Sequence, residues 1–207
     1  MSNVAIILGA GSGTRMKSEK NKMLLDIMGT TVIQRSVNAF LEIPYVDEII
    51  VTAREQELDE FSKLLTDERI TFVIGGDTRQ KSVKNAVETI EDAELIIIHD
   101  GARPFVKSDD IANTIRAALE YDAAALGVPV KDTIKVIDDN NFVVDTPDRA
   151  TLFAVQTPQV FKLDMYKSAL EKAEKDEKDF TDDCQLIEYN GGMVKMVVGS
   201  YDNIKIT

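Results

Sequence analysis

The chain has 207 residues, which is enough for one α/β domain with its own hydrophobic core. Its formal net charge of −12 argues against broad binding to nucleic acid or to an anionic membrane, so a polyanionic ligand would have to meet a local cluster of cations. The single cysteine, Cys184, excludes a disulfide framework and a cysteine-rich metal site. Because no apolar run approaches about 18 residues and the N-terminus reads as a core strand, we expect no transmembrane helix, no signal peptide and a cytoplasmic location.

Apolar runs alternate with segments of helical period along the first 130 residues. The predicted strands are residues 4–8, 48–52, 70–74, 94–100 and 123–130. The predicted helices between them are residues 32–41, 55–65, 80–90 and 109–121. This alternation predicts a mostly parallel sheet with helices on its faces, and the near-continuous apolar strands fit a sheet buried on both sides.

The pattern changes after Pro129. Residues 134–146 predict a β-hairpin around a polar turn, which we interpret as an insertion at about 132–152 within one domain that spans residues 1–207. The remaining predicted elements are a strand at 152–155, a helix at 163–175, a helix that starts near "TDD", a strand at 193–198 and a final strand in "GSYDNIKIT".

A glycine-rich loop follows the first strand in "ILGAGSGTRM", with Gly9, Gly11 and Gly13 in five residues. Backbone N–H groups in such a loop, at the start of a helix, can bind phosphate. The spacing does not fit a dinucleotide fingerprint, which needs glycine where Thr14 stands, and no G-x-x-x-x-G-K-[ST] pattern occurs. The glycines alone are equally compatible with a tight turn that binds nothing. The cations that follow favour anion binding; they are Arg15, Lys17, Lys20 and Lys22.

Several polar segments follow other strands. Asp100, at the end of "IIIHD", is placed to bind a hard cation such as Mg²⁺, or else to serve as a turn or cap residue. Asp77 in "GGDTRQKS" and Thr181 in "FTDD" both fit helix N-caps, and "QTPQ" and "DNIKIT" fit turns. The only histidine, His99, is expected to be a packed strand-end residue rather than a metal ligand.

Taken together, these segments resemble one known family. The matching motifs, in chain order, are "GAGSGTRM", "GGDTRQKSV", "HDGARPF", "PVKDTIK", "TPQVF", "TDD" and "GSYDNIKIT". From Val4 to Thr207 the chain is similar to the 2-C-methyl-D-erythritol 4-phosphate cytidylyltransferases of isoprenoid biosynthesis. The ribitol-5-phosphate cytidylyltransferases share most of the pattern, but "PVKDTIK" and "TDD" look more like the methylerythritol branch. The resemblance implies a Rossmann-like, glycosyltransferase-A-like nucleotidyltransferase fold, and a homodimer whose β-arm exchanges between subunits.

The resemblance also implies an activity and a set of site residues. The reaction would join CTP and methylerythritol phosphate to give CDP-methylerythritol and pyrophosphate, with Mg²⁺ or another divalent cation bound at Asp100. Arg15 and Lys22 would be the catalytic cations. Nucleotide contacts would fall on Ala10, Gly11, Gly13, Gly76, Asp77, Ser82, Asp100 and Gly101. Sugar-phosphate positioning would fall on Arg149 from the partner subunit and on Lys205, Arg103, Thr133, Thr157, Thr181 and Asp202.

The chain also departs from the family pattern. Asn21 and Met23 flank Lys22 where the family usually has proline and glutamine, and Gly9-Ala10 stands where two alanines are usual. These departures motivate one alternative, a non-catalytic nucleotide-binding protein of the same fold. CTP transfer to another polyol phosphate such as ribitol 5-phosphate also stays open, because that family shares most of the pattern. The lack of a credible Ser–His or Cys–His pair suits direct attack by a phosphate, which needs no covalent nucleophile.

Overall fold

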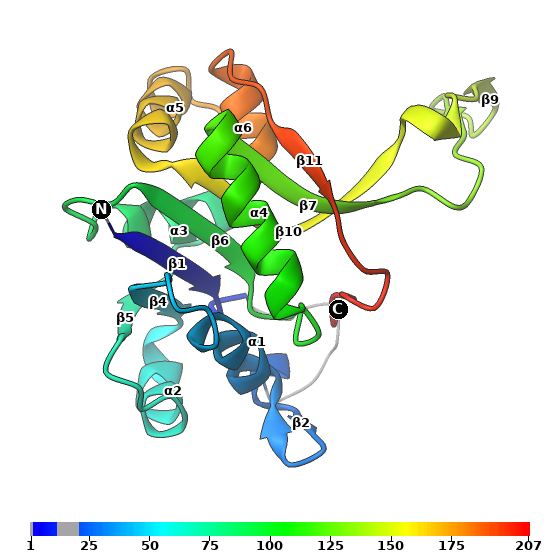
Figure 1. The fold of residues 1–207 in the computed structure, drawn as a ribbon. Helices are drawn as coiled ribbons and strands as arrows, with labels where there is room; N and C mark the ends of the chain where they lie inside the picture. Colours follow the sequence, from blue (N-terminus) through cyan, green and yellow to red (C-terminus); the bar gives the residue numbers. More distant parts are fainter. Residues whose placement is uncertain (1, 12–20) are drawn as a thin grey trace.

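The computed structural model describes residues 2–11 and 21–207. Figure 1 shows a central sheet covered by helices and a hairpin that projects away from this body. The predicted site residues Gly13 and Arg15, together with Lys17 and Lys20, lie outside the described residues.

The central sheet has seven strands in the order β11-β7-β10-β6-β1-β4-β5. Strand β10 is antiparallel to its neighbours β6 and β7, whereas the other neighbouring pairs are parallel. The predicted mixed, mostly parallel sheet is therefore confirmed. The strands are β1 Asn3–Leu8, β4 Glu48–Ala53, β5 Ile70–Ile74, β6 Leu95–Asp100, β7 Ala123–Pro129, β10 Phe153–Lys162 and β11 Lys195–Val198.

Helices cover both faces of the sheet, so the central strands β1, β4, β6 and β7 are buried along nearly their whole length. Ala5 and Ile7 of β1 belong to one core with α1, α2 and α4, whereas Val4 and Ile6 belong to the other core with α3, α5 and α6. This is why the strands read as continuous apolar runs. The helices are α1 Val32–Leu41, α2 Leu58–Leu64, α3 Arg79–Val87, α4 Ser108–Tyr121, α5 Leu163–Lys175 and α6 Asp183–Tyr189. In the described part of the chain, none of the helices has the length and apolar character needed to span a bilayer.

The start of α1 shows how local sequence fixes a boundary. Thr31 caps the helix by accepting a hydrogen bond from Gln34 N–H, and the Gln34 side chain accepts one from Thr31 N–H in return. The helix predicted at 55–65 is different, because it begins as a 3₁₀ turn, η3 (Glu55–Glu57), before α2 continues it. The short hairpin of β2 (Asp26–Ile27) and β3 (Thr30–Thr31) was not predicted.

The polar stretch "QTPQ" lies inside β10, so the turn expected there is wrong. The pairing of β10 with β7 shifts register between Val155 and Gln159, which accommodates the irregular stretch within the strand. Its polar side chains are buried because they have specific partners. Thr157 Oγ1 accepts from Asp100 N–H, and Gln159 Oε1 accepts from Asp183 N–H.

The final strand predicted in "GSYDNIKIT" is also wrong, because the described residues after β11 form a turn and an irregular segment. Asn203 is fully buried and donates from Nδ2 to Gln156 Oε1 and to the Thr157 carbonyl. Ile206 N–H donates to the Ala102 carbonyl. These contacts hold the segment beside the carboxyl end of β6 and the middle of β10 instead of adding it to the sheet edge.

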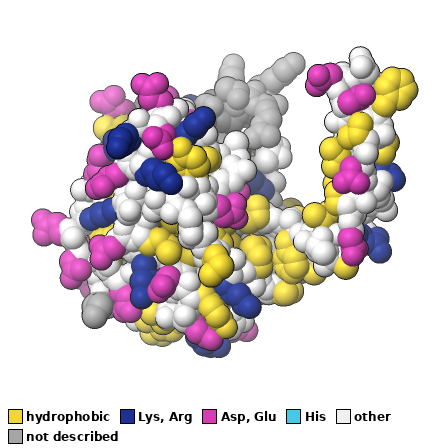
Figure 2. Space-filling model, turned by 90° about the horizontal axis from the view of Figure 1, so that it is seen from above, with side chains coloured by type: hydrophobic (Ala, Val, Ile, Leu, Met, Phe, Trp, Pro, Cys, Tyr) yellow, Lys and Arg dark blue, Asp and Glu magenta, His cyan; other side chains and the backbone are white. Residues whose placement is uncertain are grey.

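The predicted hairpin is confirmed as β8 (Val136–Ile137) paired antiparallel with β9 (Val143–Asp145). A 3₁₀ turn, η4 (Arg149–Thr151), follows it before β10 begins. We refer to residues 131–152 as the arm. Figure 2 shows hydrophobic side chains along the arm, which stands away from the rest of the molecule. The exposed apolar side chains of the arm are Ile134, Val136, Ile137, Phe142, Val143 and Val144.

Candidate active site

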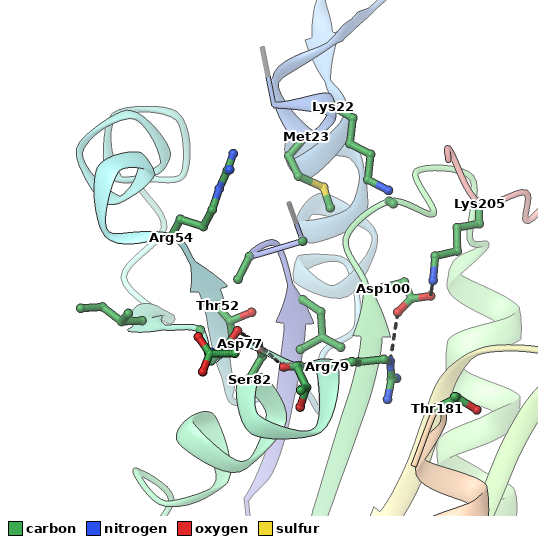
Figure 3. Close-up of a pocket in the computed structure, with 18 of the residues that line it drawn as sticks. Lys22, Met23, Thr52, Arg54, Asp77, Arg79, Ser82, Asp100, Thr181 and Lys205 are labelled. Carbon is green, nitrogen blue, oxygen red and sulfur yellow. Dashed lines mark hydrogen bonds and ion pairs between the residues drawn. The ribbon is translucent and has the colours of Figure 1, made fainter. Parts of the chain in front are cut away.

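A pocket of about 780 Å³ opens at the carboxyl ends of four neighbouring parallel strands (Figure 3). The strands β1, β4, β5 and β6 contribute Leu8, Thr52, Ile74 and Asp100 to its lining. This is the edge of an open α/β sheet where ligands are expected to bind.

Close backbone packing explains two of the glycines beside the pocket. A Cβ added to Gly75 would lie 2.3 Å from Ala10 Cβ, and one added to Gly9 would lie 2.7 Å from the Thr52 carbonyl oxygen. The loops after β1 and β5 therefore pack directly on each other. Ser82 Oγ accepts a hydrogen bond from Gly76 N–H at 3.0 Å, so the first turn of α3 anchors the loop after β5.

Asp100 stands at the centre of a cluster of cations. Lys205 Nζ lies 2.7 Å from Asp100 Oδ2, while Arg103 Nε lies 3.7 Å from the same oxygen and Arg79 Nε lies 3.6 Å from Oδ1. Burial disfavours the charged carboxylate, but Arg79 and Lys205 outweigh it and lower the pKa of Asp100 to about 2. Asp100 is therefore ionised at neutral pH although it is buried.

A second carboxylate fixes Arg79 from the opposite side. Arg79 Nη1 lies 2.6 Å from Asp183 Oδ2, and the other carboxylate oxygen accepts from the Tyr166 hydroxyl at 2.6 Å. Burial alone would lower the pKa of Arg79, but Asp183 and Asp100 raise it above its usual value. No site role was assigned to Arg79 or Asp183 from the sequence, although both lie within the quoted motifs. Their ion pair joins distant parts of the chain, so no local sequence pattern indicates it.

Lys22 enters the pocket from the 3₁₀ turn η2 (Lys22–Leu24) and donates from Nζ to the Ile206 carbonyl at 3.0 Å. Figure 3 shows Lys22 and Lys205 directed toward the side of the pocket where Asp100 lies. Two cations that are far apart in the sequence thus line one pocket. Such a cluster provides fixed positive charge for phosphate oxygens.

His99 is packed in the core, as expected, and it orders the backbone at Asp100. Its Nε2 lies 3.2 Å from the Arg103 carbonyl, which can only accept, so Nε2 carries the proton and Nδ1 accepts from the Thr157 hydroxyl at 3.0 Å. Thr157 Oγ1 in turn accepts from Asp100 N–H at 3.0 Å. Burial lowers the pKa of His99 to about 4, although the Asp100 carboxylate opposes that shift, so this neutral tautomer persists at neutral pH.

The structure brings many of the predicted site residues together and leaves others elsewhere. The predicted residues that line the pocket are Ala10, Gly11, Lys22, Gly76, Asp77, Ser82, Asp100, Thr181 and Lys205. Three others lie next to Asp100 but outside the pocket lining: Gly101, Arg103 and Thr157. Thr133 and Arg149 belong to the arm, where Arg149 Nη1 donates to the Lys131 carbonyl. Asp202 is exposed, 3.9 Å from Lys107 Nζ.

Two expected helix caps are wrong. Thr78, not Asp77, caps α3 by accepting from Lys81 N–H, while the Asp77 carboxylate is exposed in the pocket lining. Asp182, not Thr181, caps α6, because its Oδ1 accepts from Cys184 N–H and Gln185 N–H. In each case the neighbouring side chain reaches the free N–H groups of the first turn. Asp77 and Thr181 are therefore not used as caps and remain at the pocket.

The acidic side chains at the pocket indicate which kind of metal site it could form. Within the described ranges, no group of three or more His, Cys, Asp or Glu side chains could hold a metal ion by itself. Asp100 nevertheless supplies an ionised carboxylate inside the pocket. Mg²⁺ is commonly bound by one or two carboxylates with substrate phosphates and water, so these residues fit a cation that arrives with a nucleotide.

The similarity to known proteins extends over nearly the whole chain. The family model described as 2-C-methyl-D-erythritol 4-phosphate cytidylyltransferase matches residues 3–207. A protein of that name from Caldanaerobacter subterraneus subsp. tengcongensis is 46% identical over 209 residues, which cover 98% of this chain and 92% of the relative. Another from Clostridium botulinum is 40% identical, with coverage of 98% and 92%. The crystal structure of 4-diphosphocytidyl-2C-methyl-D-erythritol synthase from Anaerococcus prevotii superposes with a TM-score of 0.90 at 34% identity, covering 100% of this chain and 90% of that one.

Proposed function

Since the chain belongs to the 2-C-methyl-D-erythritol 4-phosphate cytidylyltransferase family, we propose that its pocket joins CTP to 2-C-methyl-D-erythritol 4-phosphate and releases pyrophosphate. The observation that carries this proposal is a pocket at the carboxyl ends of the parallel strands in which Arg79 and Lys205 pair with Asp100. Lys22 lines the same pocket. The product is CDP-methylerythritol, an intermediate of isoprenoid biosynthesis.

The reaction needs little proton chemistry. A phosphate oxygen of methylerythritol phosphate attacks the α-phosphorus of CTP, the bond from that phosphorus to the bridging oxygen breaks, and pyrophosphate leaves with the electron pair. The second pKa of a phosphate monoester is about 6, so the nucleophile is largely a dianion at neutral pH and needs no general base. The barrier comes from the approach of two anions and from charge in the transition state, where fixed cations and positioning act.

The catalytic role falls on Lys22 and on Arg15, which lies outside the described residues. Lys205 would hold the phosphate of the sugar, and Arg149 of the partner subunit would complete that pocket. Arg103 and Thr157 would support it through Asp100, with Thr133, Thr181 and Asp202 around the sugar. The residues proposed to contact the nucleotide are Ala10, Gly11, Gly13, Gly76, Asp77, Ser82, Asp100 and Gly101.

Mg²⁺, or another divalent cation, would be held by Asp100 together with the oxygens of the bound triphosphate. When bound, it would neutralise charge on the phosphates of CTP. The ionised state of Asp100 supports this role, and its ion pair with Lys205 would have to rearrange as the ligands enter. The described residues themselves would orient the triphosphate and oppose its charge through Lys22, Arg79 and Lys205.

A homodimer is part of the proposal. The arm exposes large apolar side chains such as Phe142, Val143 and Val144, whose burial against a second copy would be favourable. The same exchange would carry Arg149 to the pocket of the partner. We place the enzyme in the cytoplasm, in contact with the cellular CTP pool.

The proposal is tested by measuring pyrophosphate release with CTP and Mg²⁺ across a panel of polyol phosphates. Methylerythritol phosphate should give the highest kcat/KM. Faster turnover of ribitol 5-phosphate would move the chain to the other branch, and no release with any member of the panel would leave a nucleotide-binding protein without this activity.

A further inference from the structure

A buried carboxylate outside the cation cluster joins the turn that carries Lys22 to the turn η3, which follows β4. Glu57, the last residue of η3, is only 6% exposed. Its Oε1 accepts from Asn21 Nδ2 at 2.6 Å and from Arg54 Nε at 2.9 Å. The side-chain hydrogen bond to Glu57 raises the pKa of Arg54, whereas burial opposes this. One oxygen therefore gathers donors from two separate segments at the pocket wall.

Asn21 passes this anchoring on to the turn that carries Lys22. Its Oδ1 accepts from Met23 N–H at 3.0 Å, and its carbonyl accepts from Leu24 N–H at 3.0 Å. The amide of Asn21 is thereby fixed at both ends: the oxygen caps η2 and the nitrogen is bound to Glu57. The fixed amide of Asn21 sets the direction in which the side chain of the following residue, Lys22, leaves the backbone.

We propose that Glu57 is a positioning residue for Lys22, acting through the side chain of Asn21. This inference rests on the proposed catalytic role of Lys22. A displacement of about 1 Å in a group that contacts the reacting phosphates can cost on the order of 100-fold in rate. Because the bonds of Asn21 link Glu57 to the turn that carries Lys22, loss of the Glu57 carboxylate should lower kcat while CTP binding changes less.

The test compares Glu57→Ala and Asn21→Ala with Asn21→Pro. Asn21 has a φ of −59°, close to the value that proline fixes, so proline can hold the backbone of the turn without the amide. We expect Glu57→Ala and Asn21→Ala to lower kcat by about tenfold or more. We also expect that the double variant Asn21→Pro/Glu57→Ala recovers much of the kcat lost in Glu57→Ala.

Thr114→Ala is the matched control for general destabilisation. Thr114 is fully buried in α4, donates to the Asp110 carbonyl and does not line the pocket. It should lower the melting temperature without changing kcat per folded molecule. If Glu57→Ala behaves in the same way as this control, the carboxylate is merely structural and the inference is overturned.

Two further variants separate the possible failures. Adding Glu57→Ala to Lys22→Ala should lower kcat no further, because the positioned group is already gone. An equal loss of kcat in Arg54→Met would show that Glu57 acts through Arg54 and would overturn the inference. Wild-type turnover in Lys22→Ala would refute the proposed catalytic role of Lys22 and with it the proposed function. If Lys22→Ala is impaired and Glu57→Ala is not, only the further inference is refuted.

Discussion

Lys205 Nζ lies 2.7 Å from Asp100 Oδ2, so a cation from the end of the chain is paired with the carboxylate that ends β6. Lys205 reaches this position because Asn203 is buried against β10 and Ile206 N–H is bound to the Ala102 carbonyl. The pair keeps a positive group at the pocket that an incoming phosphate can engage.

Replacing Lys205 by alanine should affect the sugar phosphate more than the nucleotide. We expect the KM for methylerythritol phosphate to rise by at least tenfold, since a charge-assisted hydrogen bond contributes about 1.5–3 kcal/mol. The KM for CTP should change much less. Steady-state kinetics with each substrate varied in turn gives both values, and an equal rise in the two would count against the assigned contact.

Replacing Asp100 by asparagine should remove the effect of Mg²⁺ on CTP binding. Asparagine keeps the shape of the side chain but not the charge that a hard cation prefers. Calorimetric titration of CTP with and without Mg²⁺ measures this directly. Mg²⁺ should strengthen CTP binding to the wild type and leave the Asp100→Asn variant nearly unchanged; the same enhancement in both proteins would argue that the cation is held elsewhere.

The stability of the protein should fall in two steps as the pH decreases. Unfolded His99 takes up a proton below about pH 6.5, but burial lowers its folded pKa to about 4, so stability is lost as the pH falls from 6.5 to 4. The lowered pKa of Asp100 gives a second loss between about pH 4 and 2. The first loss is at most about 1.4 kcal/mol per pH unit.

Urea unfolding at a series of pH values measures this dependence. A His99→Gln variant keeps a polar side chain at this position but does not titrate, so its free energy of unfolding should vary less between pH 6.5 and 4 than that of the wild type. A variant with an unchanged slope would mean that other groups cause the acid sensitivity.

If Arg149 acts across the dimer, two inactive variants should complement each other. Lys22→Ala and Arg149→Ala each disable both sites of their own homodimer, but a mixed dimer contains one site with both residues intact. Random exchange of equal amounts should restore about a quarter of the wild-type activity. Mixtures that stay inactive after verified subunit exchange would show that Arg149 does not serve the neighbouring site.

Local sequence signals predicted the parts of the fold that depend on local physics. Residues 32–41 form α1 with the predicted bounds, because Thr31 and Gln34 cap the helix and its apolar residues recur with helical spacing. The strands of the parallel part of the sheet were visible as apolar runs for a similar reason. The resemblance then named several pocket residues in advance, including Lys22, Asp100 and Lys205.

The errors arose where distant partners decide the structure. Thr157 and Gln159 look like turn residues, but inside β10 their side chains bind Asp100 and Asp183. Asn203 likewise reads as part of a strand until its buried partners on β10 are known. The links of Arg79 to Asp183 and of Asn21 to Glu57 join separate elements, so spacing along the chain could not reveal them.

The most direct test of the catalytic centre is the turnover of Lys22→Ala with saturating CTP, methylerythritol phosphate and Mg²⁺. Loss of a fixed positive group that stabilises the transition state should lower kcat by on the order of 10²–10³ while the protein stays folded. Turnover close to that of the wild type would contradict the account, because the two phosphates would then be joined without the cation around which the proposed chemistry is built.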